Sequence, residues 1–150
     1  MEDISAGTAR TPLRDGMLSG PLDAPEQLRL VGSRCRNCNE VSLGTNALCP
    51  NCGGDSLDQI PLAERGTLWS FTVVRHRPPG NYGGKDPFEP FGLGLIELPE
   101  GLRVLAPIDA DIAALKIGMP LKFKAVVRSA ETGERILFAF TPVNEDLSAR

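Results

Sequence analysis

The two segments Cys35-Arg36-Asn37-Cys38 and Cys49-Pro50-Asn51-Cys52 hold the only four cysteines of this 150-residue chain. Each segment is a Cys-x₂-Cys hook, and two hooks brought face to face by a hairpin supply the four thiolates of a tetrahedral zinc site. Four cysteine ligands leave no open position for water, so the expected role of the metal is structural. Two disulfides or four buried thiols are the alternative interpretation, but nothing in the chain indicates secretion. The predicted Zn²⁺ ligands are Cys35, Cys38, Cys49 and Cys52.

The residues around the hooks are typical of a rubredoxin-like zinc ribbon. Residues 28–32 alternate like a strand that leads into the first hook, and residues 41–44 form the return strand. Asn37 and Asn39 at the first hook, and Asn51, Gly53 and Gly54 at the second, are turn residues of types that tolerate the positive φ that turns backbone N–H groups toward the thiolates. We therefore predict a zinc ribbon over residues 28–58. A ribbon of this size buries little apolar surface, so metal binding is expected to supply its folding energy.

The segment before the ribbon, residues 1–27, is predicted to be an arm that ends in a short helix. Residues 1–20 show no period of 2 or 3.6, which leaves either a disordered terminus or an arm that orders against a partner. Asp23 as N-cap, followed by Pro25 and Glu26, predicts the start of the helix.

After the ribbon, strand patterns alternate with turns. Gly66 is expected to bulge or bend the first strand, with Leu68 and Phe71 on opposite faces. A single helical turn, capped by Asp109 or Asp111, is expected between the third and fourth strands. The expected strands cover residues 61–74, 91–98, 102–108, 121–127 and 135–143.

This order of elements predicts the fold class. Five strands with one helical turn match a small Greek-key barrel of the OB type, and an open sheet of the same strands is the alternative. The chain is therefore expected to be mainly β, with the zinc ribbon followed by a five-stranded OB-fold barrel over residues 59–143 and a polar tail over 144–150.

The composition restricts the classes of partner and compartment. The net charge is -3, the pI is about 5.2 and only 5% of residues are aromatic, whereas proteins that bind a phosphate backbone usually carry a basic face and a high pI. The N-terminus lacks the basic and apolar regions of a signal peptide. No apolar stretch approaches the roughly 18 residues of a membrane span. Because the cysteines are also spaced as metal ligands rather than as disulfide partners, these features predict a cytoplasmic protein without a membrane partner.

The inventory of reactive side chains argues against catalysis by this chain alone. His76 is the one histidine, and the metal is expected to occupy all four cysteines, so no Cys–His pair remains for thiolate chemistry. The chain also lacks the Gly-x-Ser-x-Gly elbow of serine hydrolases. We therefore expect a non-catalytic protein.

The loop over residues 77–92 is the candidate ligand- or partner-binding region, because loops of this length inside a compact domain are usually functional or disordered. Its basic side chains can hold phosphates, and its tyrosine can stack on a ring. Its phenylalanines either pin the loop to the barrel or form a docking patch. The alternative interpretation of the basic residues is that they lie at the base of the loop, exposed to solvent, and bind nothing. The predicted contact residues are Arg75, His76, Arg77, Tyr82, Lys85, Phe88 and Phe91.

Taken together, these motifs resemble the acyl-CoA-associated zinc-ribbon/OB-fold family of accessory subunits. The resemblance covers roughly residues 25–142. The motifs that match, besides the first hook, are Cys49-Pro50-Asn51-Cys52-Gly53, Gly66-Thr67, Thr72-Val73-Val74, Pro90-Phe91, Glu97-Leu98-Pro99-Glu100-Gly101 and Ile117-Gly118-Met119. Pro99 in the hairpin turn departs from the family pattern and affects only that turn.

The resemblance implies a non-catalytic subunit of a thiolase-fold enzyme that cleaves C–C bonds of acyl-CoA thioesters by a thiolytic or retro-aldol reaction, as in benzoylsuccinyl-CoA thiolase. It implies a heterotetramer of two small and two large subunits, with a CoA thioester at the interface. In this interpretation the chain stabilises its partner and shapes the acyl-CoA site. Whether the partner is a thiolase, an aldolase or a hydratase stays open.

A single-stranded nucleic-acid-binding module is the competing interpretation, since zinc ribbons and OB folds bind single strands in other proteins. The acidic pI disfavours it. The expected second and third barrel strands also offer no stacking platform, because Leu93, Leu95, Leu102 and Val104 replace aromatic residues there. A stand-alone CoA carrier is a third interpretation, for which the chain has no dedicated motif.

Overall fold

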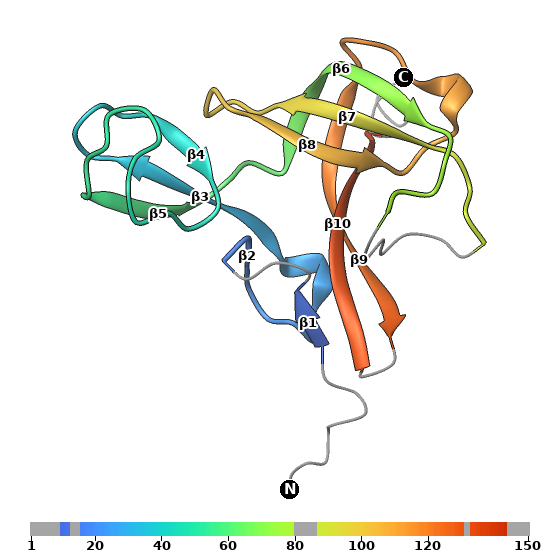
Figure 1. Cartoon of the computed structure of the whole chain (residues 1–150), viewed down its shortest axis with the longest axis horizontal. Coiled ribbons are helices and arrows are strands. Elements are labelled where there is room, and N and C mark those ends of the chain that lie inside the picture. Colours follow the sequence, from blue (N-terminus) through green and yellow to red (C-terminus); the bar gives the residue numbers. More distant parts are fainter. Residues whose placement is uncertain (1–9, 13–15, 80–86, 131–132, 144–150) are drawn as a thin grey trace, which may run out of the picture.

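The computed structural model describes residues 10–12, 16–79, 87–130 and 133–143. Most of these residues lie in strands, which form a small sheet around the cysteine hooks and a barrel beside it (Figure 1). Among the described residues, no helix is long and apolar enough to cross a membrane.

The ribbon is built on β3 (Arg29–Cys35), which pairs antiparallel with β4 (Val41–Leu43) on one edge and with β5 (Leu57–Pro61) on the other. Ser33 in β3 is buried, and its hydroxyl donates a hydrogen bond of 2.6 Å to the carbonyl oxygen of Gly44. The backbone N–H of Asn46 donates to the same hydroxyl at 3.1 Å. Ser33 therefore fixes the turn after β4, which leads toward the second hook.

The barrel closes through five strands. β9 pairs with β6, which is followed in order by β7, β8 and β10, and β10 returns to pair along its length with β9. This arrangement confirms the predicted closed OB-type barrel rather than an open sheet. The predicted helical turn is η3 (Ile112–Ala114), capped by the Asp111 side chain, which accepts a hydrogen bond from the backbone N–H of Ala113 at 3.3 Å. The barrel strands are β6 (Arg65–Val74), β7 (Phe91–Glu97), β8 (Arg103–Ile108), β9 (Pro120–Ala130) and β10 (Gly133–Pro142).

The bulge in β6 lies at a different residue from the one predicted. The register with β7 shifts directly after Leu68, so Trp69 is the extra residue. Phe71 consequently packs on the same core as the fully buried Leu68, while Trp69 is 46% exposed. The prediction of opposite faces for Leu68 and Phe71 is therefore wrong, because a bulge resets strand alternation. Gly66 instead permits close packing, since a Cβ there would lie 2.6 Å from the carbonyl oxygen of Glu97.

The N-terminal arm contains two short strands that the sequence pattern did not predict. β1 (Arg10–Pro12) pairs parallel with β10, and β2 (Leu18–Ser19) pairs antiparallel with the start of β3. The strand β1 covers an edge of β10 that would otherwise expose unpaired backbone groups. Residues 1–9 and the tail 144–150 lie outside the described residues.

The short helix before β3 is a single 3₁₀ turn, η2 (Pro25–Gln27). Ala24, rather than Asp23, occupies its N-cap position, and no side chain caps the turn. The prediction of Asp23 as N-cap is therefore wrong, because the helix begins one residue later than the capping pattern indicated.

One apolar core joins the ribbon to the barrel. Leu28, Leu30 and Leu62 belong to the ribbon side and are almost completely buried. They pack in one cluster with barrel residues that include Leu68, Ile96, Leu121, Ile136 and Phe140. The turn between β7 and β8 adds a polar contact, because the backbone N–H of Ala63 donates to the Glu100 carboxylate at 2.9 Å. The ribbon is therefore packed on the barrel rather than tethered to it.

Candidate metal centre

The structure brings the four cysteine sulfurs into one cluster in which all Sγ atoms lie within 4.8 Å of one another. The Sγ atoms of Cys35 and Cys52 are 3.6 Å apart, as are those of Cys38 and Cys49. These distances are too long for a disulfide, in which the sulfurs are about 2.05 Å apart. They fit a tetrahedron with Zn–S bonds of about 2.3 Å, whose edges measure about 3.8 Å. The donor set therefore fits a four-coordinate Zn²⁺.

The backbone of the two hooks follows the same path. Asn39 and Gly53 have φ of 68° and 78°, and Asn39 is the one non-glycine residue with positive φ in the described part of the chain. The backbone N–H of Asn39 donates to the carbonyl oxygen of Cys35 at 2.9 Å. The N–H of Gly53 donates to the carbonyl oxygen of Cys49 at the same distance. The predicted positive φ after each hook is thereby confirmed, and the two hooks are near-copies of one another.

Backbone N–H groups point at the sulfurs from within each hook. Asn37 N–H donates to Cys35 Sγ at 3.3 Å, and Asn51 N–H donates to Cys49 Sγ at 3.4 Å. Donors of this kind favour the charged thiolate, the form that binds metal, over the neutral thiol. At Cys35 they are outweighed by burial and by the neighbouring thiols, which raise its pKa.

The asparagine side chains reach across from each hook to the other. Asn37 Nδ2 donates to Cys52 Sγ at 3.5 Å, and Asn51 Nδ2 donates to Cys38 Sγ at 3.4 Å. The Asn37 side chain, followed by the backbone N–H of Gly54, lowers the pKa of Cys52 to about 6. The Asn51 side chain is likewise the main cause of a lowered pKa for Cys38. The sequence pattern had marked these asparagines only as turn residues, although asparagine stands directly before the second cysteine of both hooks.

Replacing Asn37 or Asn51 with alanine is expected to weaken zinc binding without preventing folding. Removing a residue that orients a metal ligand typically lowers metal affinity by about 10- to 100-fold. Competition with a chromophoric chelator measures the change. Gln59→Ala, an exposed position on β5 of the same ribbon, is the matched control and should retain the wild-type affinity. Equal zinc affinity in all three variants would show that the asparagine side chains do not support the site.

The predicted basic contact residues lie at the end of β6. Arg75, His76 and Arg77 directly follow this strand, and all three are exposed. Tyr82 and Lys85 lie outside the described residues. The structure thus groups three of the five polar residues at one end of the barrel, and their role in ligand binding stays a prediction.

The two predicted aromatic contact residues lie at the start of β7. Phe88 and Phe91 are half-buried, and their rings meet edge to face with centroids 6.2 Å apart. Phe91 pairs in register with Val74, the last residue of β6, so the aromatic pair lies beside the strand end that precedes the basic residues.

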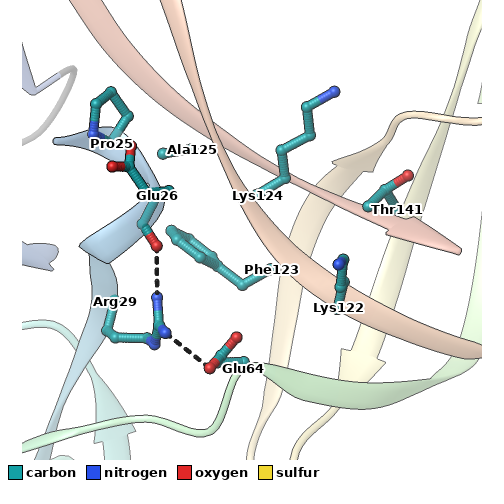
Figure 2. A pocket seen from close by; sticks show the side chains of 9 residues that line it. All are labelled: Pro25, Glu26, Arg29, Glu64, Lys122, Phe123, Lys124, Ala125 and Thr141. Atoms are coloured by element: carbon teal, nitrogen blue, oxygen red, sulfur yellow. Dashed lines mark hydrogen bonds and ion pairs between the residues drawn. The ribbon is translucent and has the colours of Figure 1, made fainter. Parts of the chain in front are cut away.

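A pocket of about 410 Å³ lies elsewhere, between η2, the ribbon-to-barrel link and β9 (Figure 2). Arg29 is already paired inside it, because its guanidinium donates to the Glu64 carboxylate at 2.7 Å and to the Glu26 carbonyl oxygen at 3.3 Å. None of the predicted contact residues lines this pocket. Its lining residues are Pro25, Glu26, Arg29, Glu64, Lys122, Phe123, Lys124, Ala125 and Thr141.

Two family models match consecutive parts of the chain. The model described as "ChsH2, rubredoxin-like zinc ribbon domain" matches residues 22–58. The model described as "ChsH2, C-terminal OB-fold domain" matches residues 59–128. The two matches cover the cysteine cluster and the barrel strands up to β9.

Individual relatives carry names of enzyme subunits and of a scaffold. The chain is 34% identical over 92 residues to benzoylsuccinyl-CoA thiolase subunit BbsA of Thauera aromatica, a match that covers 59% of this chain and 59% of that protein's length. It is 30% identical over 98 residues to a DUF35 domain-containing scaffold protein of Pyrococcus furiosus, covering 65% of this chain and 68% of that protein. A solved structure, "Ltp2-ChsH2(DUF35) aldolase", aligns with a TM-score of 0.58 at 27% identity, covering 80% of this chain and 89% of the matched chain.

Proposed function

Since the chain belongs to the ChsH2 (DUF35) family of zinc-ribbon and OB-fold proteins, we propose that it is a non-catalytic accessory subunit of a thiolase-fold enzyme complex that acts on acyl-CoA thioesters. The observation that carries this proposal is the convergence of all four thiols on one point, where they fit a Zn²⁺ ion and leave no cysteine for catalysis. The names of the Thauera thiolase subunit and of the Ltp2-ChsH2 aldolase point to the same class of complex.

The division of labour follows from the chemistry. Thiolase reactions use a nucleophilic cysteine with an adjacent base. The single histidine, His76, is exposed at a strand end, and a cysteine bound to structural zinc is not free to attack a thioester. The larger subunit therefore supplies the catalytic groups for thiolytic or retro-aldol cleavage. This chain, with its Zn²⁺, stabilises that subunit and shapes the acyl-CoA site in a cytoplasmic complex of two small and two large subunits.

Purification of the native complex tests the proposal. Full-length tagged chain should co-purify with a thiolase-fold subunit, in equal amounts and at the mass of two copies of each. The purified large subunit should lose its acyl-CoA cleavage activity without this chain and regain it when the chain is added back. A thiolase-fold subunit that is fully active and stable alone would contradict the proposal.

The predicted contact with the CoA thioester has its own test. Arg75→Gln combined with Arg77→Gln is expected to raise the KM of the complex for acyl-CoA by about 10-fold, because two cations near the CoA phosphates are lost. Zinc content and complex formation should stay at wild-type values. The control removes two exposed cations elsewhere, Arg34→Gln with Lys116→Gln, and should leave KM unchanged. An unchanged KM in the Arg75/Arg77 variant would leave these residues without a role in ligand binding.

A further inference from the structure

The hairpin of β9 and β10 projects beyond the barrel (Figure 1). β6 pairs with β9 only over Pro120–Lys122, and β10 meets β8 in register only at Phe140. The two strands of the hairpin therefore pair mainly with each other, and their two faces have different surroundings. One face is part of the core, where Ile136 is 1% exposed.

The opposite face has a different composition. Side chains alternate along a strand, so Lys122, Lys124, Val126 and Arg128 share one face of β9. In the register of the hairpin, Leu137 lies opposite Val126, and Arg135 lies opposite Arg128. Figure 2 shows the start of this alternation, because Phe123 points toward Arg29 while the neighbouring lysines point away from it. We call these six residues, Lys122, Lys124, Val126, Arg128, Arg135 and Leu137, the outer hairpin face.

The outer hairpin face carries more positive charge than the described chain neutralises. Lys124 forms an ion pair with Asp109. Within residues 16–79, 87–130 and 133–143, no ion pair joins Lys122, Arg128 or Arg135 to a carboxylate. This excess stands out in a chain whose net charge is -3.

The two arginines form the least balanced part of this face. Arg128 and Arg135 are directly opposed across the two strands, and like charges in that arrangement repel. The Nε of Arg128 is buried and has no hydrogen-bond partner among the described residues. A buried donor without an acceptor destabilises a fold unless a partner arrives from outside.

We propose that the outer hairpin face docks onto an acidic surface of the catalytic subunit, with Val126 and Leu137 at the centre and the four cations around them. This inference rests on the proposed function. An apolar centre surrounded by charged groups is the usual anatomy of a protein interface, in which arginine is enriched. Each guanidinium can bind a carboxylate through two hydrogen bonds, which would relieve the repulsion between Arg128 and Arg135.

A nucleic-acid strand fits the same face less well. Proteins that bind single strands combine cations with aromatic side chains on which bases stack. The outer hairpin face has no aromatic residue, and its centre is aliphatic. The charge and the apolar centre together therefore favour an acidic protein surface.

The test uses the full-length chain with Arg128→Gln and Arg135→Gln, and the purified thiolase-fold subunit with which the wild-type chain co-purifies. Affinity should fall about 10- to 100-fold, mainly through slower association, and its salt dependence should weaken. The free variant should keep its zinc and melt at or above the wild-type temperature, because a like-charge pair has been removed. Arg34→Gln with Lys116→Gln removes the same charge elsewhere and should bind within about twofold of wild type.

Each outcome is decisive. Wild-type affinity in the Arg128/Arg135 variant would overturn the docking face while leaving the accessory-subunit function intact. Tight binding of a 20-nucleotide oligo(dT) to the wild type, lost in this variant, would assign the face to nucleic acid instead. Failure of the wild-type chain to bind any thiolase-fold subunit would refute the proposed function, and the docking proposal with it, without involving these arginines.

Discussion

Cys35→Ser should reduce bound zinc from one ion per chain to nearly none and unfold the ribbon. Cys35 is fully buried at the end of β3, the strand on which both other ribbon strands pair. In zinc-finger peptides a structural zinc ion contributes about 10–16 kcal/mol of apparent binding free energy, which is also folding free energy. Around the hooks themselves, away from the residues that pack on the barrel, the three short strands of this ribbon have no comparable source of stability. Metal analysis gives the zinc content, and hydrogen exchange of the β3 amides reports the unfolding.

The same substitution is expected to release the partner enzyme, because the ribbon shares its core with the barrel through Leu28 and Leu30. Cys49→Ser should behave in the same way, since Cys49 is the equivalent buried ligand of the second hook. Leu48→Ala is the matched control, because Leu48 is 60% exposed beside Cys49 and should keep its zinc. A zinc-free variant that still supported full activity of the partner would show that the hooks serve another purpose.

Phe140→Ala is expected to destabilise the barrel by about 3–5 kcal/mol, the usual cost of removing a fully buried phenylalanine. Phe140 is 0% exposed, and its ring lies edge-on to Phe123 with centroids 6.1 Å apart. It is also the residue through which β10 meets β8, where the barrel closes. Urea denaturation of the zinc-loaded chain measures the free energy of unfolding.

Phe138→Ala provides the comparison for this prediction. Phe138 lies two residues away on the same strand and stacks on the same ring, with centroids 6.1 Å apart, but it is only partly buried. Its loss should therefore cost clearly less than the loss of Phe140. Equal losses for the two variants would indicate that the position where the barrel closes carries no special share of its stability.

The features that were predictable from the sequence are those that neighbouring residues encode. The spacing of the two hooks indicated the cluster of sulfurs, and the asparagines and glycines around the hooks indicated positive φ, which the structure shows at Asn39 and Gly53. Strand alternation and turn residues were sufficient for five barrel strands and the capped turn at Asp111.

The features that were not predictable depend on residues that meet only in the folded chain. The bulge at Trp69 follows from register against β7, and nothing in the local sequence marks it. The parallel pairing of β1 depends on the free edge of β10, which lies more than a hundred positions away along the chain. The hydrogen bond from Asn37 to Cys52 and the opposition of Arg128 and Arg135 likewise cannot be predicted until it is known which segments pair.

The shared core gives this chain a mechanical property. Because Leu30 and Leu62 are buried in the same cluster as the barrel residues, the ribbon packs in a fixed position against the barrel. Gly32 lies at this contact, where a Cβ would approach within 2.6 Å of the Leu62 side chain. In the proposed complex, a partner that binds the hairpin of β9 and β10 would therefore also set the position of the ribbon.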